Sequence, residues 1–319
     1  MQLIRFLKNW TLPVAILTGF VAYELYAHIP LFDATRQMAP KVVAVLQPVL
    51  IFTMLFLSFC KVDARQLRPR LKHLWLLMIQ AGAFALGALI LHAFPDMPGG
   101  VVLQGCMLCM ICPTATSACV VTGKLGGDAA DVTMYTVLIN LTAALVVPAL
   151  VPLFHDMAGA GFLASFMRIL GRVFPMLICP FIAAQACRWL LPGLTRKFVS
   201  VPDLPFYLWA VSLSIAIAVT TRSIAHSSET VAEITAVAVG SLVCCILQFA
   251  LGTWIGIRQG SRVSTAQSLG QKNTVFAIWV GYTFLNPVTS IAGGFYSVWH
   301  NVYNTWQLKR MRDLSNQPS

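Results

Sequence analysis

The sequence predicts an all-α membrane protein with ten transmembrane helices. Hydrophobic residues make up 58% of the 319 positions, charged residues only 10%, and the mean hydropathy is +0.76. A soluble domain carries about 25% charged residues, because its surface must be hydrated. Lipid is therefore the expected solvent. In lipid, a helix bonds all of its backbone polar groups internally.

Ten apolar segments are long enough for the roughly 30 Å hydrocarbon core, which takes about 20 helical residues. They are Trp10–His28, Val42–Cys60, Leu74–Phe94, Gly100–Thr122, Val132–Phe154, Phe174–Leu191, Leu204–Arg222, Val231–Ile257, Ser264–Phe284 and Pro287–Gln307. Before the sixth segment, Phe162–Gly171 is expected to form a separate interfacial helix that carries Arg168. No hydrophilic domain interrupts the spans, so residues 1–319 are predicted to form a single transmembrane transporter domain.

The basic residues predict the orientation. With a cytoplasmic N-terminus, sixteen of the 22 Lys and Arg residues lie on the cytoplasmic side, five lie outside, and Lys272 lies within a span. The positive-inside rule then places both termini in the cytoplasm. The same topology accounts for the net charge of +11 through attraction to anionic lipid headgroups. We therefore expect a multi-pass protein of the cell (inner) membrane, with no nucleic-acid partner.

Ten spans divide into two halves, at about 10–155 and 162–307. Because five is odd, the second half begins with the opposite orientation, which is the inverted-repeat architecture of many secondary transporters. The fourth and ninth spans are corresponding members of the two halves, and they are the most polar spans. The repeat and the polarity together favour a transporter.

Both polar spans contain features that interrupt a helix. Cys112–Cys119 contains a proline and three hydroxyl side chains, and Ser264–Thr274 contains two glutamines, a lysine and an asparagine around Gly270. Interrupted helices are tolerated in lipid where the freed backbone groups line a buried cavity, and their ends are natural ion or anion sites. The alternatives are small-residue packing in the fourth span and a hydrogen-bond clamp in the ninth. The matching positions in opposed halves favour a functional site.

At these spans the sequence resembles the bile acid:sodium symporter family. The matching motifs are Cys112–Cys119 continuing through Gly126-Gly127-Asp128, the Leu-Gly-Gln-Lys-Asn stretch at 269–273, and Ser297-Val-Trp-His-Asn301. The resemblance implies a core of spans three to five and eight to ten, a panel of spans one, two, six and seven, and crossing broken helices beside a substrate cavity. It also implies alternating-access transport of an organic anion, whether bile-acid-like, sulfonated or a small carboxylate.

The resemblance also places the site residues. The family's substrate contacts fall on residues of matching type, namely Thr116, Asn273, His300 and Asn301. Its ion-site positions fall on Gln80, Ala118, Cys119, Val132, Thr136, Ser268, Leu269, Gln271 and Lys272. Gln80 and Thr136 match the family, whereas its ninth-span carboxylate falls on Ser268 and its glutamine on Lys272. Its Ser-Asn pair falls on Ala118-Cys119 and a further serine on Val132. The implied sodium site is therefore degenerate.

Lys272 is the only basic residue deep within a predicted span. It lies ten residues beyond Arg262, or about 15 Å along a helix, near the middle of the bilayer. A lysine there costs about 2.5–3.5 kcal/mol on insertion scales, and snorkelling to the interface would have to cover too great a distance. All eleven acidic residues fall in loops or near span ends, so no charged oxygen cage is expected at the midplane. Sodium and other cofactors are accordingly not expected.

Two functions remain open for Lys272. In the first, its ammonium replaces sodium as a fixed positive charge that attracts the substrate, so Lys272 joins the predicted substrate-binding residues. In the second, its amine binds and releases a proton during the transport cycle. The alternatives to a sodium-independent carrier are a sodium-coupled symporter with a residual site, a channel, and a metalloid exporter that uses Cys119. From another class, an intramembrane hydrolase would use Ser268 and Lys272 as a dyad.

The remaining candidates favour structural interpretations. Cys106, Cys109 and Cys112 have the spacing of a metal motif, but no further ligand set accompanies them, and cysteine also packs well as a small apolar residue. His300 lacks a second ligand at useful spacing, so no metal is predicted. The nine cysteines lie almost wholly inside spans, which makes a disulfide framework unexpected. The expected partners are a small organic anion and the lipid bilayer, and a monomer is plausible.

Overall fold

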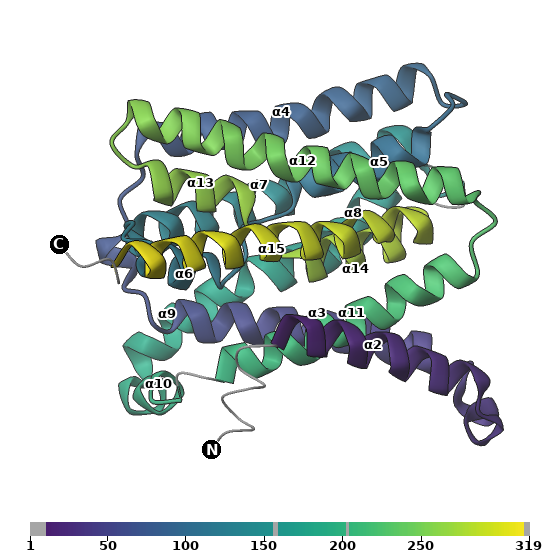
Figure 1. Cartoon of the computed structure of the whole chain (residues 1–319), viewed down its shortest axis with the longest axis horizontal. Coiled ribbons are helices and arrows are strands. Elements are labelled where there is room, and N and C mark those ends of the chain that lie inside the picture. Colours follow the sequence, from purple (N-terminus) through teal and green to yellow (C-terminus); the bar gives the residue numbers. More distant parts are fainter. Residues whose placement is uncertain (1–10, 156–158, 202–203, 316–319) are drawn as a thin grey trace.

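The computed structural model describes residues 11–155, 159–201 and 204–315 as an assembly of helices (Figure 1). Within these ranges no β-strand forms, and the one β-type pairing is an isolated antiparallel bridge between Thr114 and Lys272. The predicted start of the first span at Trp10 lies outside the described residues. So do Arg5 and Lys8, which the orientation prediction counted, and Asp156 and Asp203, two of the acidic residues that were placed in loops or near span ends.

The long helices are α2 (Thr11–His28), α3 (Ala39–Phe59), α4 (Leu71–Ala93), α7 (Ala129–Phe154), α8 (Gly161–Leu177), α9 (Cys179–Leu190), α11 (Leu204–Ala225), α12 (Val231–Arg258) and α15 (Ser290–Ser315). The two polar spans are each split, into α5 (Gly100–Ile111) with α6 (Ala118–Lys124) and into α13 (Arg262–Gly270) with α14 (Thr274–Phe284). The connecting elements are α10 (Pro192–Val199) and the short helices η1 (Pro30–Thr35), η2 (Ala64–Gln66) and η3 (Pro287–Thr289). The predicted interruption of both polar spans is therefore present in the structure.

Six helical segments of the described chain are long and apolar enough to cross a membrane. They are Ala39–Phe59, Leu71–Ala93, Ala129–Phe154, Gly161–Leu190, Tyr207–Ala225 and Val231–Arg258, and α5 and α14 are shorter apolar helices. The chain is therefore a multi-pass membrane protein. Breaks shorten the helices of the fourth and ninth spans, and polar residues lower the hydropathy of α15. Ten spans in two repeats remain a prediction.

The sixth span differs from its prediction. Phe162–Gly171 is not a separate interfacial helix, because it forms the first part of α8, and α8 and α9 together make one apolar segment at Gly161–Leu190. Ile178 between them stays in the right-handed helical region, so Pro175 does not end the segment. The side chains of Ser165, Ile169 and Val173 are buried, and α8 packs along α7. This packing buries one face of α8, whereas hydropathy alone assigned the helix to the membrane–water interface.

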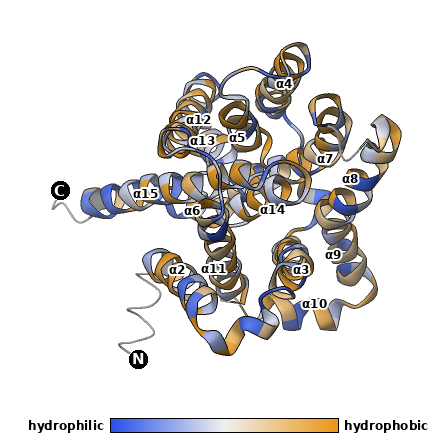
Figure 2. Cartoon of the chain, turned by 90° about the vertical axis from the view of Figure 1, so that its right-hand side faces the viewer, coloured by the Kyte–Doolittle hydropathy of each residue, from blue (hydrophilic) through white to orange (hydrophobic). Residues whose placement is uncertain are grey.

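The helices form two groups when viewed along their axes (Figure 2). In one group α2 packs on α11, and α3 packs on α9 and α11. In the other, α12 packs on α13, α5 and α15, while α4 packs on α5 and α7. The groups meet where α3 and α11 contact α14, where α11 contacts α15, and where α8 contacts α7. Both broken helices belong to the second group.

Candidate functional site

The two helix breaks meet and bond to each other. Pro113 has no N–H to continue α5 and disfavours helical geometry at Cys112, which has an extended ψ of 128°. On the other side, Gln271 is extended, with ψ of 108°. The Ala115 N–H donates to Gln271 O at 2.9 Å, and the Asn273 N–H donates to Pro113 O at 2.8 Å. Each break thus satisfies backbone groups that the other would leave unpaired in lipid.

Side chains from several helices donate to backbone carbonyl groups at the breaks. At the end of α5, Gln248 Nε2 donates to Cys109 O at 3.2 Å, and Gln80 Nε2 donates to Met110 O at 2.5 Å and to Cys112 O at 3.2 Å. At the other break, Tyr296 O–H donates to Gly270 O at 2.8 Å, Thr114 Oγ1 to Ser268 O at 2.6 Å, and Cys112 Sγ to Asn273 O at 2.9 Å. Tyr135 in turn donates its hydroxyl proton to Gln80 Oε1. The crossing is therefore held by α4, α7, α12 and α15 together.

Lys272 lies in this crossing and points toward the end of α5. Its Nζ donates to Met110 O at 3.3 Å, its backbone N–H donates to His300 Nδ1 at 3.2 Å, and the residue is 1% exposed. No ion pair among the described residues includes it. The ammonium instead faces the C-terminal end of a helix, where the backbone dipole is negative. Lys272 thus places a buried amine at the negative end of a helix dipole.

The predicted substrate residues lie around the same crossing. Thr116 is half-buried in the break after α5, and Asn273, 8% exposed, is the residue before α14. His300 is buried and accepts the Lys272 N–H, so it supports the break directly. Asn301 is half-buried, and its Nδ2 donates to Ser297 O in its own helix at 2.7 Å. The fold therefore assembles polar groups from three spans, whose contact with substrate remains a prediction.

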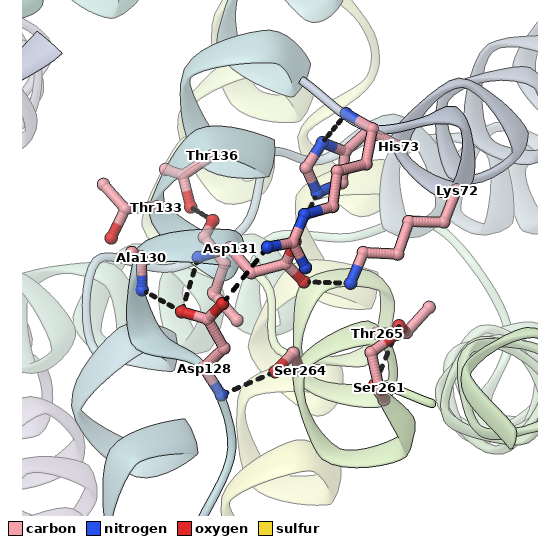
Figure 3. Close-up of polar contacts among 12 residues, drawn as sticks. Lys72, His73, Asp128, Ala130, Asp131, Thr133, Thr136, Ser261, Ser264 and Thr265 are labelled. Carbon is pink, nitrogen blue, oxygen red and sulfur yellow. Dashed lines mark hydrogen bonds and ion pairs between the residues drawn. The ribbon is translucent and has the colours of Figure 1, made fainter. Parts of the chain in front are cut away.

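Sequence reasoning missed a buried charge cluster between α4 and α7 (Figure 3). Lys72 Nζ lies 2.5 Å from Asp131 Oδ2, and His73 Nε2 lies 3.1 Å from Asp131 Oδ1. The side chains of all three residues are 2–3% exposed. The half-exposed Arg70 approaches Asp131 at 3.5 Å and Asp128 at 3.8 Å. From the sequence, Lys72 and Asp131 count as charges of loops or span ends. Their positions within the first turns of apolar helices could have indicated that they are buried.

The hydrogen bonds of this cluster orient the ring of His73. Its Nδ1 accepts the Arg70 N–H at 3.2 Å, and its Nε2 lies 3.1 Å from Asp131 Oδ1. The cluster also reaches the broken ninth span, because the Asp128 N–H donates to Ser264 Oγ at 2.8 Å. It therefore connects α4, α7 and α13.

A sequence model of the sodium bile acid symporter family matches residues 48–227, more than half of the chain. The chain belongs to the sodium bile acid symporter family. Among individual curated proteins, no sequence matches the chain. Membership makes the protein a membrane transporter of organic anions, not an enzyme, and the crossed breaks are where a carrier of this kind would place its site.

Several of the positions where the resemblance puts the family's ion ligands carry no side-chain oxygen here. Ala118, Val132 and Leu269 are buried apolar residues. The side chains of three others are engaged with protein groups: Cys119 Sγ donates to Thr116 O, Thr136 Oγ1 to Val132 O, and Gln271 Nε2 to Ser117 Oγ. The helix α13 ends at Gly270, between Ser268 and Lys272. The two side chains therefore do not share a helix face, which the predicted hydrolase dyad would require.

The side-chain hydrogen bonds to carbonyl groups at the breaks should contribute measurably to the free energy of unfolding. Tyr296→Phe removes the hydroxyl that donates to Gly270 O and accepts from Gln248 Nε2, so a buried donor and a buried acceptor lose their partner. We expect a loss of about 1–3 kcal/mol in the free energy of unfolding, measured in mixed detergent micelles. Tyr303→Phe is the matched control, because the described contacts of Tyr303 are ring contacts with Phe249 and Trp306. Equal losses in both variants would contradict the assignment.

Proposed function

We propose that this family member is a ten-span secondary transporter that moves an organic anion by alternating access without sodium. The carrying observation is the buried Lys272 ammonium at Met110 O, 3.3 Å away. A coupling cation at this crossing would neutralise the carbonyl ends of the broken helices and raise the local positive potential. A protonated lysine side chain supplies the same charge from within the chain.

The donor set around the crossing supports the absence of a sodium cage. Sodium is a hard cation that binds oxygen ligands, and in a low-dielectric site a carboxylate among them compensates its charge. Here Ser268 stands at the family's carboxylate position, and the carbonyl oxygens of Met110, Cys112 and Gly270 already accept hydrogen bonds from side chains. A sodium ion would also be repelled by the neighbouring ammonium of Lys272.

The substrate is an anion held beside this charge. Lys272 is 1% exposed, so it acts mainly through its electrostatic field, which a low-dielectric surrounding screens weakly. Direct hydrogen bonds would come from Thr116 and Asn273 at the breaks and from His300 and Asn301 on α15. Their amide, hydroxyl and imidazole groups suit a carboxylate or sulfonate oxygen. Bile-acid-like molecules, other sulfonated anions and small carboxylates all offer that group.

The proposed membrane arrangement follows from the charge distribution. Both termini lie in the cytoplasm, the protein resides in the cell (inner) membrane, and the two five-span repeats have opposite orientation. In this arrangement α6 and α13 face the cytoplasmic side, while α5 and α14 face outward. Alternating access then consists of movement of the group that contains both broken helices against the group that contains α2, α3, α9 and α11.

Uptake without sodium tests this proposal. We expect saturable uptake of labelled taurocholate or pantoate into proteoliposomes, with an initial rate that changes by less than twofold when choline replaces sodium on both sides. Counterflow by unlabelled anion inside the vesicles should accelerate the uptake, because a carrier exchanges its substrate whereas a channel does not. Protein-free liposomes are the control. A large loss of rate in choline would overturn sodium independence, and the absence of saturable uptake of any probe anion would overturn the transporter assignment.

A further inference from the structure

Arg222 lies near the end of α11 where the two helix groups meet. Its guanidinium donates from Nη1 to the hydroxyl oxygen of Tyr282 on α14, at 2.7 Å. One residue further along α11, Ser223 Oγ lies 3.4 Å from Ser290 Oγ at the start of α15. The proposed topology places this end of α11 on the outer side of the membrane. The Arg222–Tyr282 contact therefore joins the two helix groups at their outer ends.

The packing around this contact is close. A Cβ atom added at Gly294 of α15 would lie 2.8 Å from Thr220 Cγ2, so the backbone of α15 rests directly against α11. Ala216 and Val219 of α11 belong to the same buried cluster as Phe276 and Phe284 of α14. By contrast, the main packing partners of α6 and α13 are α7, α12 and one another. The described arrangement is thus closed between the groups at the outer end.

Arg222 has no carboxylate partner to explain its presence in this interface. None of the ion pairs among the described residues includes it, and its described side-chain hydrogen bond goes to the neutral phenol of Tyr282. A guanidinium has five N–H donors, and the side chain is half-buried. A cation without a counter-ion at a helix interface is costly in a membrane protein and usually has a function. In an anion transporter, the missing partner is the substrate.

The spacing places Arg222 along the substrate path. Tyr282 follows Lys272 by ten residues, most of them in α14, which corresponds to about 12–15 Å of helix toward the outer side. Arg222 and Lys272 are therefore two positive charges at successive depths of the interface between the helix groups. An anion that enters from outside would meet Arg222 first and the crossing residues Thr116 and Asn273 next.

We propose that Arg222 and Tyr282 form an outer binding site for the carboxylate or sulfonate group of the transported anion. This proposal rests on the proposed function and deepens it. When α11 separates from α14, Arg222 loses its bond to Tyr282 and presents its planar fork of donors to two oxygens of the head group, while the Tyr282 hydroxyl donates to the same anion. When the anion moves inward, the Arg222–Tyr282 bond forms again and closes the outer end.

The test compares uptake from the two sides of the membrane. Labelled taurocholate is offered to right-side-out and inside-out vesicles, and initial rates give KM for each side. Arg222→Gln should raise the outer KM about tenfold or more, because charge-assisted hydrogen bonds are lost, and should leave the inner KM within twofold. Arg222→Lys should have an intermediate effect, since it keeps the charge and loses the fork. Arg168→Gln is the matched control, because Arg168 is an exposed arginine on the same side in the proposed topology.

Tyr282→Phe distinguishes an Arg222 that binds substrate from an Arg222 that only holds α11 against α14. If Arg222 served only to hold α11 against α14, Tyr282→Phe would reproduce Arg222→Gln, and the outer site would be overturned. The outer site requires a smaller rise of the outer KM in Tyr282→Phe, since the guanidinium remains. If wild-type vesicles take up taurocholate and Arg222→Gln leaves the outer KM unchanged, or raises both KM values equally, the outer site alone fails. If wild-type vesicles show no saturable uptake, the transport proposal fails, and this one fails with it.

Discussion

Asp131→Asn should reduce the free energy of unfolding by about 3–5 kcal/mol, which is the usual cost of removing one partner from a buried ion pair. The Asp131 carboxylate receives Lys72 Nζ at 2.5 Å and His73 Nε2 at 3.1 Å. The neutral amide would leave the Lys72 ammonium, whose side chain is 3% exposed, without a counter-charge. It would also disturb the contact that joins the first turns of α4 and α7. Unfolding by denaturant in mixed micelles measures the loss.

Two further variants identify the cause of that loss. Asp63→Asn removes a carboxylate from a more exposed pair with Arg188, at 3.5 Å and with side chains 30–39% exposed, and exposed pairs contribute about 0–1 kcal/mol. Lys72→Met combined with Asp131→Leu removes both buried charges and should recover most of the stability that Asp131→Asn loses. If Asp63→Asn costs as much as Asp131→Asn, or the double variant is the least stable of the set, burial of an unpaired charge is not the cause.

The sequence predicted those parts of the fold that local chemistry determines. Pro113 and the polar stretch around Gly270 marked both helix breaks, because a missing N–H and flexible backbone interrupt a helix wherever they occur. Phe162–Gly171 was assigned wrongly to a separate helix for the opposite reason: its amphipathic pattern is compatible with an interface as well as with packing on α7. Hydropathy does not distinguish a helix face that enters the membrane interface from one that packs on a neighbouring helix.

The candidate site was predicted less completely than the fold. The spacing from Arg262 placed Lys272 near mid-span, and the family resemblance indicated the residues around it. The partners of those residues come from distant parts of the chain. Gln80, Gln248 and Tyr296 cap carbonyl groups on α5 and α13 that lie between 26 and 139 residues away in sequence. A single sequence carries no signal for such pairings. Lys72 and Asp131 were missed for the same reason, since each resembles an ordinary charge at a span end.

Removing the charge of Lys272 and adding a carboxylate at the crossing should together make anion uptake depend on sodium. Lys272→Gln removes the buried ammonium from Met110 O and installs the glutamine that the resemblance assigns to this position. We expect the apparent affinity for taurocholate to fall at least tenfold in the absence of sodium, since one charge-assisted contact contributes about 1.5–3 kcal/mol. Without a carboxylate nearby, sodium should restore little of this affinity.

Adding Ser268→Glu to Lys272→Gln provides the missing carboxylate. The buried glutamate raises the affinity of the crossing for a cation, so uptake by the double variant should recover when sodium is present and stay low in choline. Ser268→Glu alone is the matched control, because it adds the carboxylate while Lys272 keeps its positive charge, so it should weaken anion uptake equally in sodium and in choline. Sodium-independent uptake by Lys272→Gln at the wild-type rate would show that the ammonium has no role in binding. A double variant that remains inactive in sodium, although folded, would show that the lysine does more than replace a bound cation. The comparison therefore distinguishes a lysine that replaces a cation from one that only fills space at the end of α5.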